Sequence, residues 1–454
     1  MPTSQERSVS GGLLFVLRAL NHRNYRLFFF GHGLSLLGTW MQHLALGWLV
    51  FKLTGDEFKL GLVGFAGQLP NMVIAPMAGV FADRWDRRRI LLGTQALSLL
   101  QAAGLATMVL TGFIRDPGDV WYLIGMSLLL GLINAVDIPV RQSFVVEMVG
   151  SREDLAAAIP LNSFLMNGTR FLGPSLAGLV VYWWGEGFCF LFNSASYLAV
   201  IAALLAMRLA PRARRVERHR FLHELHEGVS YAWRTPHIRL VLFFLATVSL
   251  VGIPYMVLMP AFAKVVFHGD SKTQGFLMGA VGLGAVCGTF MLASQRSPLG
   301  LGRIMATGTL VFGAGLTAFS FCGLTWDWLA PHLWGRPATE LPPNLVLWLA
   351  GPVLAAVGFG QVSQLVAGNT LLQMVVEEDK RGRVMSLHTV AFLGTMPLGS
   401  LLAGTVARHL LGPTWTVFAG GLACLAAAAF FSARLRALRS VLEAAGARRE
   451  ETTA

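Results

Sequence analysis

Charged side chains are scarce in this chain and gather in a few short stretches. One of them, residues 79–89 with the sequence GVFADRWDRRR, places six charges between two long apolar segments. The carboxylate of Asp83 lies among four arginines there and can pair with them or with the positive end of a facing helix. Contacts of this kind form and break together, so the stretch suits a conformational switch better than a catalytic centre.

A second charged pair, Asp137 and Arg141, lies close to one end of a later apolar segment. Residues four positions apart share a helix face, so these two side chains are expected to pair. Two interpretations remain open for the pair, which are an ion pair that anchors the helix end and a role in gating or coupling.

Arg170 differs from these groups because it lies about midway along an apolar segment. A charge at the centre of a bilayer is costly, so it should face a cavity or a partner. Binding of an anionic substrate group and pairing with Asp137 are two explanations. Snorkelling of the side chain toward an interface is the third.

Uncharged polar residues add a further group of candidates. His32, Ser35, Thr39 and Gln42 follow one another at spacings of three and four, which puts them on one helix face. Such a stripe favours a helix that lines water or a ligand, although hydrogen bonding between helices explains each residue equally well. Amides in other segments extend the candidate binding set, namely Gln68, Asn71, Asn134, Gln361 and Gln364.

The elements that position these residues are predicted to be membrane-spanning helices. Hydrophobic residues make up 54% of the 454 positions, charged residues 13%, and the mean hydropathy is +0.59. A soluble chain carries about 25% charged residues. A spanning helix needs about 20 mostly apolar residues, and about twelve such segments are present. They lie near 27–51, 60–82, 90–114, 119–140, 155–182, 187–207, 240–267, 273–294, 303–325, 344–370, 383–411 and 413–433.

The distribution of charge sets the expected topology. With both termini inside, most of the 36 Lys and Arg residues fall at cytoplasmic positions. The net charge of +12 therefore reports topology and not a nucleic-acid partner. Residues 1–25 lack the apolar core of a signal peptide, so the first spanning segment is expected to direct insertion into the cell (inner) membrane.

The longest break in hydrophobicity divides the chain into two halves. The expected organisation is an N-terminal six-helix bundle (1–207), a basic cytoplasmic linker with an amphipathic helix (208–239), and a C-terminal six-helix bundle with a cytoplasmic tail (240–454). Glycines at 168, 173 and 178 recur at 394, 399 and 404. This weak internal repeat is typical of transporters built from repeated units around a midplane site.

The charged stretch at 79–89 resembles the loop between the second and third helices of the major facilitator superfamily. Its matching residues are Gly79, Asp83, Arg84, Arg87 and Arg88, and Asp86 departs from the pattern by standing where the family has Gly. The resemblance implies that the loop acts as a latch that stabilises the outward-facing state. The stretches 24–28, 38–42 and 137–142 are similar to those of enterobactin exporters and drug-efflux relatives, and 168–178 partly resembles the fifth-helix motif of antiporters.

These features together predict a secondary active transporter that exports amphipathic small molecules, drug-like or siderophore-like, by alternating access. Proton coupling is expected, with Asp137, His32, His43 and His388 as candidate titrating groups. The alternatives are lipid-like cargo or uptake in the same fold, and a non-transporting membrane sensor or scaffold. No enzymatic activity, cofactor, metal site or nucleic-acid partner is predicted, and the protein is expected to act as a monomer among membrane lipids. The histidines at 219, 223 and 226 are assigned to a basic surface helix.

Overall fold

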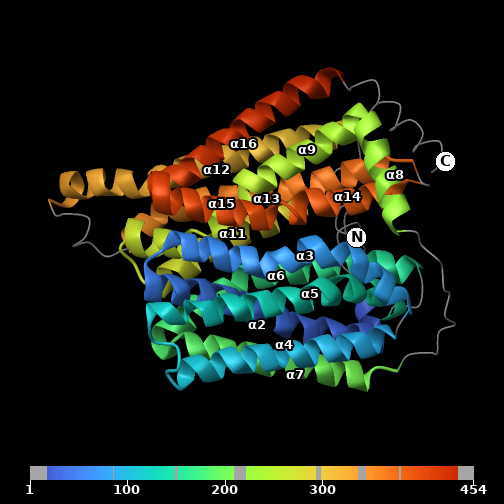
Figure 1. The fold of residues 1–454 in the computed structure, drawn as a ribbon. Coiled ribbons are helices and arrows are strands. Elements are labelled where there is room, and N and C mark those ends of the chain that lie inside the picture. The colour runs from blue at the N-terminus through green and yellow to red at the C-terminus, as the bar shows by residue number, and fades with distance from the viewer. Residues whose placement is uncertain are drawn as a thin grey trace, which may run out of the picture.

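The computed structural model describes residues 18–84, 86–148, 152–208, 221–292, 298–335, 344–377 and 380–437. Within these ranges every regular element is a helix, which confirms the all-α membrane class. The helices run roughly parallel or antiparallel to one another and gather in two sets (Figure 1).

The first set contains the helices of the N-terminal part of the chain, shown in blue to green in Figure 1. A short 3₁₀ turn, η1 (Arg18–Asn21), leads into it, and another, η2 (Pro117–Asp119), joins two of its helices. Its long helices are α2 (Arg23–Thr54), α3 (Glu57–Arg84), α4 (Arg87–Leu110), α5 (Val120–Met148), α6 (Arg152–Trp184) and α7 (Glu186–Ala206).

The second set follows a linker helix, α8 (Phe221–Arg234), and lies above the first in Figure 1. Its continuous helices are α11 (Ser271–Leu292), α12 (Pro298–Trp334), α13 (Asn344–Val375) and α16 (Gly412–Ala437). Two further crossings are broken into pieces. They are α9 (Pro236–Val251), η3 (Ile253–Met256), α10 (Met259–Ala261) and η4 (Phe262–Val266), and later α14 (Arg381–Leu393), α15 (Met396–Val406) and η6 (Ala407–Leu411).

Prolines account for both breaks. Pro254 and Pro260 start short turns in the first broken crossing, and Pro397 starts α15 in the second. Proline has no backbone N–H and its ring clashes with the preceding turn, so it interrupts the i to i−4 ladder. The predicted segments 240–267 and 383–411 are therefore discontinuous.

The described residues contain nine helical stretches that are long and apolar enough to cross a membrane. The last of these, Arg381–Leu435, holds both α14–α15 and α16, while α3 and α6 fall outside that count. These two helices have 28 and 33 residues, so at about 1.5 Å per residue they exceed the ~30 Å hydrocarbon core. The expected number of twelve spanning helices stays a prediction.

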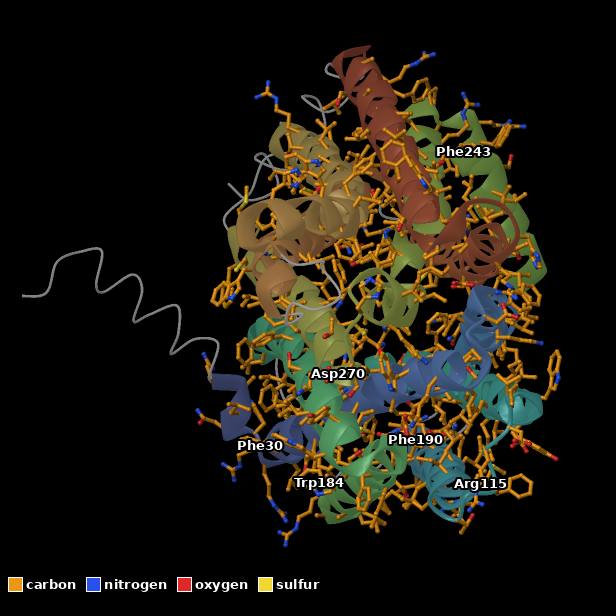
Figure 2. All side chains as sticks on the ribbon, turned by 90° about the vertical axis from the view of Figure 1, so that its left-hand side faces the viewer. Phe30, Arg115, Trp184, Phe190, Phe243 and Asp270 are labelled. Carbon is orange, nitrogen blue, oxygen red and sulfur yellow. The ribbon has the colours of Figure 1, made fainter. Side chains whose placement is uncertain are left out.

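The outer surface carries large apolar side chains. Figure 2 views the molecule along its helices and shows Phe30, Trp184 and Phe243 at the rim, and they are 64%, 62% and 55% exposed. Phe190, labelled in the same view, is fully buried. An apolar rim of this kind suits contact with lipid tails, because the core of a bilayer contains no water.

The two ends of the helix array differ in their contacts. We call the end that holds α8 and Asp86 the linker end, and the end that holds Asp270 and Arg115, which faces the viewer in Figure 2, the far end. The two sets of helices pack against each other through α6 with α11 and α3 with α15, and both contacts reach the far end. A Cβ added to Gly275 would lie 2.9 Å from Cα of Gly178, and one added to Gly404 would lie 2.8 Å from Cα of Gly61.

Further far-end contacts join the same sets. The hydroxyl of Ser271 donates to the carbonyl of Gly178 at 3.0 Å, and Nζ of Lys272 lies 3.4 Å from the ring centroid of Tyr182. An ion pair between Arg408 and Asp56, with Nε and Oδ1 3.7 Å apart, adds a charged contact. Gly178 and Gly404, which the sequence repeat relates, thus occupy two corresponding helix crossings.

The stretch between the two sets contains one described helix, α8, and its amphipathic role at the membrane surface stays a prediction. Its Glu227 forms an ion pair with Arg383 of α14, with Oε2 and Nη1 2.7 Å apart, and Trp233 packs edge-on against Phe243 of α9. Trp233 and Val229 are 60% and 46% exposed. The histidines at 219, 223 and 226 lie outside the side chains that the structure describes.

Candidate functional site

The charged stretch at 79–89 covers the last residues of α3 and the first residues of α4, at the linker end. Asp86 is the N-cap of α4, and its Oδ1 accepts a hydrogen bond from the backbone N–H of Arg89 at 3.1 Å. The residue that departs from the family pattern therefore caps a helix by a common mechanism. The side chains of Gly79, Asp83 and Arg84 lie outside those that the structure describes, so the latch contact of Asp83 stays a prediction.

Two latch arginines bind the ends of neighbouring helices. Nη1 of Arg87 donates to the carbonyl of Ser143 near the end of α5 at 3.2 Å, and Nη2 of Arg88 donates to the carbonyl of Leu205 in the last turn of α7 at 2.9 Å. Leu205 is among the last carbonyls of α7, which have no partner within the helix and carry the negative end of its dipole. Arg87 and Arg88 thus hold three helices of the N-terminal set together.

Asp137 lies at the centre of a buried polar group in the N-terminal set. Its side chain is 2% exposed and pairs with Arg141, with Oδ2 and Nη1 3.3 Å apart. Its Oδ1 accepts from the hydroxyl of Thr94 at 2.6 Å and from Nε2 of Gln95 at 2.8 Å. Arg141 also approaches Nδ1 of His32 at 3.3 Å. The expected pairing of Asp137 with Arg141 is therefore present, and α2, α4 and α5 meet at it.

Arg170 occupies a different place, between the two sets of helices. Its Nη2 donates to Oε1 of Gln361 on α13 at 2.8 Å and lies 3.5 Å from the sulfur of Met256. The guanidinium carbon is 5.8 Å from the ring centroid of Trp40. Two residues predicted separately, Arg170 and Gln361, are thus brought together across 191 positions of sequence. The pairing of Arg170 with Asp137 is not found among the described contacts.

Tyr255 completes this central cluster, which we define as Trp40, Arg170, Tyr255, Met256 and Gln361. The hydroxyl of Tyr255 also donates to Oε1 of Gln361, at 3.3 Å. Sequence reasoning missed Trp40, Tyr255 and Met256 as site residues. The proline-interrupted stretch at 252–260 was the available signal, because broken spanning helices commonly form transporter sites.

Other members of the predicted binding set serve different contacts. Gln42 is 1% exposed, its Nε2 donates to Oε1 of Gln101 at 3.2 Å, and its Oε1 accepts from Nδ2 of Asn193 at 2.8 Å. Both ends of its amide are used between helices, which favours the packing interpretation for this residue. Thr39 donates to the carbonyl of Ser35 one turn earlier on its own helix.

The remaining amides make fewer hydrogen bonds between helices. Asn71 donates to Gln68 of the same helix at 3.4 Å, and Asn134 is half-buried on α5. Gln364 is fully buried, and neither its Nε2 nor its Oε1 has a hydrogen-bond partner among the described residues. Of the candidate histidines, His388 is buried with Nε2 unpartnered, and His43 is exposed beside Trp40.

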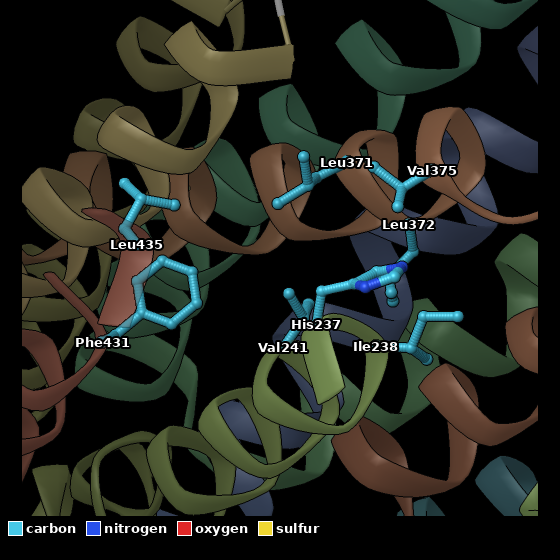
Figure 3. A pocket seen from close by; sticks show the side chains of 8 residues that line it. All are labelled: His237, Ile238, Val241, Leu371, Leu372, Val375, Phe431 and Leu435. Carbon is cyan, nitrogen blue, oxygen red and sulfur yellow. The ribbon is translucent and has the colours of Figure 1, made fainter. Parts of the chain in front are cut away.

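A small pocket lies elsewhere, near the linker end of the C-terminal set. Figure 3 shows its lining from α9, α13 and α16, which consists of His237, Ile238, Val241, Leu371, Leu372, Val375, Phe431 and Leu435. Its one polar side chain gives a ligand little to orient it. The central cluster, which offers a charge, a hydroxyl, an amide and aromatic faces, is the better candidate for recognition.

Comparison with known proteins agrees with these observations. Residues 16–333 match the major facilitator family model described as transmembrane secretion effector. The chain is 24% identical to a staphyloferrin A transporter of Staphylococcus aureus, covering 83% of this chain and 88% of the relative. It is 26% identical to the multidrug efflux pump Tap of Mycolicibacterium fortuitum (88% and 93%) and 21% identical to macrolide efflux protein A of Streptococcus pyogenes (88% and 94%).

Solved structures share the fold at low sequence identity. A bacterial homologue of the iron transporter ferroportin in an inward-facing state superposes with a TM-score of 0.66 at 15% identity, covering 91% of this chain and 98% of that one. A D-xylose–proton symporter gives 0.65 at 14% identity, covering 89% and 97%. The family match spans well over half of the chain, and the relatives confirm the expected efflux-like branch. This chain therefore belongs to the transmembrane secretion effector family of the major facilitator superfamily of membrane transporters.

Proposed function

We propose that the protein exports amphipathic small molecules by alternating access and that a proton gradient drives it. The observation that carries this proposal is the hydrogen bond between Arg170 and Gln361, which joins the two sets of helices beside aromatic side chains. A site built from both halves is the arrangement that alternating access requires. Export is supported by the relatives, two of which are efflux proteins.

The proposed topology places the linker end in the cytoplasm. Arg87, Arg88, Lys380, Arg381 and Arg383 are at this end, and short cytoplasmic loops carry the excess of basic residues. Both termini then lie in the cytoplasm and the protein is a monomer of the cell (inner) membrane. The units that move are the N-terminal bundle (1–207) and the C-terminal bundle (240–454), joined by the linker at 208–239.

The far-end contacts support an inward-facing assignment for this conformation. Gly178 against Gly275, Gly61 against Gly404 and the Asp56–Arg408 pair close that end. Opening the far end must separate these contacts, and we propose that the Asp83 latch then closes the linker end. Such exchange between two closures makes the bundle pair bistable.

Asp137 is the proposed proton-carrying residue. It is buried against Arg141 of its own helix and against Thr94 and Gln95 of α4. Protonation would neutralise the carboxylate and release Arg141, which already touches His32 of α2. A local change of charge would thereby alter the contacts of three helices.

The test uses inverted membrane vesicles with an imposed pH gradient and a panel of dyes, antibiotics and siderophores. Wild-type protein should accumulate at least one compound inside, and a protonophore should abolish the accumulation. Asp137→Asn should lose gradient-driven transport but keep exchange of internal for external substrate, because binding does not need the proton. Asp137→Glu should retain coupling.

Asp116→Asn is the matched control, because this carboxylate is exposed in the loop between α4 and α5. Full gradient-driven transport by Asp137→Asn would refute the assignment of the proton. Absence of energised transport for every compound, with well-expressed wild-type protein, would overturn export and favour lipid-like cargo, uptake or a scaffold.

A further inference from the structure

Among the residues that the structure describes, Arg170 has no anionic partner. Among the described residues no carboxylate lies within ion-pair distance of it, whereas Arg141 pairs with Asp137 and Lys52 pairs with Glu186. Its Nε is buried and has no hydrogen-bond partner in the described part of the chain. A guanidinium is always charged and offers a planar fork of donors, so this arrangement leaves recognition capacity unused.

Hydrogen-bond donors converge on one neutral oxygen at this place. Oε1 of Gln361 accepts from Nη2 of Arg170 and from the hydroxyl of Tyr255. A carboxylate or phosphate oxygen would accept from the same two donors more strongly, and a second oxygen of the same group would reach the free Nε–H. The geometry thus suits an anion better than the amide that now occupies the donors.

The surroundings of these donors are apolar and aromatic. Trp40 lies over the guanidinium, Met256 touches it, and the ring of Tyr255 packs edge-on against Phe312 with centroids 6.0 Å apart. A small hydrated anion such as free phosphate would gain nothing from these faces, whereas an aromatic or alkyl body would.

We propose that the central cluster selects amphipathic anions. Arg170 and Tyr255 bind the carboxylate or phosphate group, and Trp40 and Met256 contact the apolar part. This inference rests on the proposed transport function and names its substrate class. Since Arg170 belongs to the N-terminal set and Tyr255 and Gln361 to the C-terminal set, the anion displaces the Gln361 contact that now ties the halves.

Purified full-length protein in nanodiscs tests the proposal through quenching of tryptophan fluorescence. The probes are 1-naphthylacetate, its neutral methyl ester, cationic 1-naphthylmethylamine and lauroyl lysophosphatidate. The two anions should bind about tenfold or more tightly than the ester and the amine, because charge-assisted hydrogen bonds exceed neutral ones by that order. Tighter binding of the lysophosphatidate identifies a lipid head group as the anion, and tighter binding of the naphthylacetate identifies a free organic acid.

Two variants of the cluster, Arg170→Gln and Gln361→Glu, separate the role of charge from damage to the fold, and Arg115→Gln is the control. Arg170→Gln should weaken binding of both anions about tenfold and leave ester binding within about twofold, while Arg115→Gln at the exposed far-end loop should change neither. Gln361→Glu is nearly isosteric and places a carboxylate beside Arg170. It should abolish the preference for anions even if Arg170→Gln does not fold.

Equal affinity of wild-type protein for naphthylacetate and its ester would overturn the proposal. Unchanged anion binding in both Arg170→Gln and Gln361→Glu would also overturn it. Transport of the same probes in inverted vesicles distinguishes a wrong substrate class from a wrong proposed function. Export of the ester without preference for the anion refutes only the substrate class, whereas no export of any probe refutes the proposed function.

Discussion

Two charged residues within apolar helices are held in opposite ways. Asp137 is neutralised by Arg141 and saturated by hydrogen bonds within one set of helices. Among the described residues Arg170 has neutral partners, of which Met256 and Gln361 come from the other set and Trp40 from its own. A charge in a low-dielectric region has to be compensated. Arg141 compensates Asp137 within the protein, whereas the proposed anionic substrate would compensate Arg170.

A substitution of Gln42 tests whether this uncharged residue serves helix packing or binds the substrate. Gln42→Leu should reduce the stability by about 1–2 kcal/mol, because Asn193 and Gln101 each lose a buried hydrogen-bond partner. Substrate affinity should stay unchanged. Thermal unfolding in detergent measures the first quantity and fluorescence quenching the second.

A double-mutant cycle with Asn193→Leu provides the control. Removing both amides together should cost less than the sum of the two single changes, since no donor of that pair is then left unpaired. A tenfold loss of substrate affinity with normal stability in Gln42→Leu would instead identify a ligand contact.

At the scale of elements, the close crossing of α6 with α11 is expected to hold the far end shut. Gly275 meets Gly178 and Pro174 where α11 crosses α6, and no side chain fits between these backbones. Gly275→Ala should force the far end apart, since overpacking costs about 1–3 kcal/mol. A penalty of 1 kcal/mol shifts the equilibrium toward opening about fivefold.

Accessibility of Ser271→Cys to a membrane-impermeant maleimide reports that shift, because residue 271 is buried at this crossing. The labelling rate should rise in Gly275→Ala. Gly168→Ala is the matched control on α6, where an added Cβ has no neighbour within 4 Å. An unchanged labelling rate in Gly275→Ala would show that the crossing does not control the far end.

The helices and some contacts within them could be predicted from the sequence, whereas contacts between helices could not. Hydropathy predicted the helices, and the four-residue spacing predicted the pairing of Asp137 with Arg141. Hydropathy also placed Arg170 within an apolar helix. Its contact with Gln361, and that of Gln361 with Tyr255, arise only from the packing of separate helices. The contact of Gln42 with Asn193 spans 151 positions and leaves no local signal. Local periodicity therefore identified which residues needed partners, whereas tertiary structure chose them.

At the scale of the whole molecule, alternating access requires α6 and α11 to separate at the far end during every cycle. Ser175 and Gly279 face each other there, and a Cβ on Gly279 would lie 3.6 Å from Cβ of Ser175. Disulfides need Cβ atoms about 3.5–4.5 Å apart, so Ser175→Cys with Gly279→Cys should form one in this conformation. A Cys287→Ser background removes the exposed native thiol.

The oxidised double variant should lose transport while it keeps substrate binding, because the bond would hold the proposed inward-facing state, in which the central cluster is formed. Reduction should restore transport, and each single cysteine variant should transport with or without oxidant. These controls separate the effect of the bond from that of the substitutions. Undiminished transport by the fully oxidised protein would mean that substrate crosses without separation of α6 from α11, and rocking of the two bundles would then be the wrong description of this transporter.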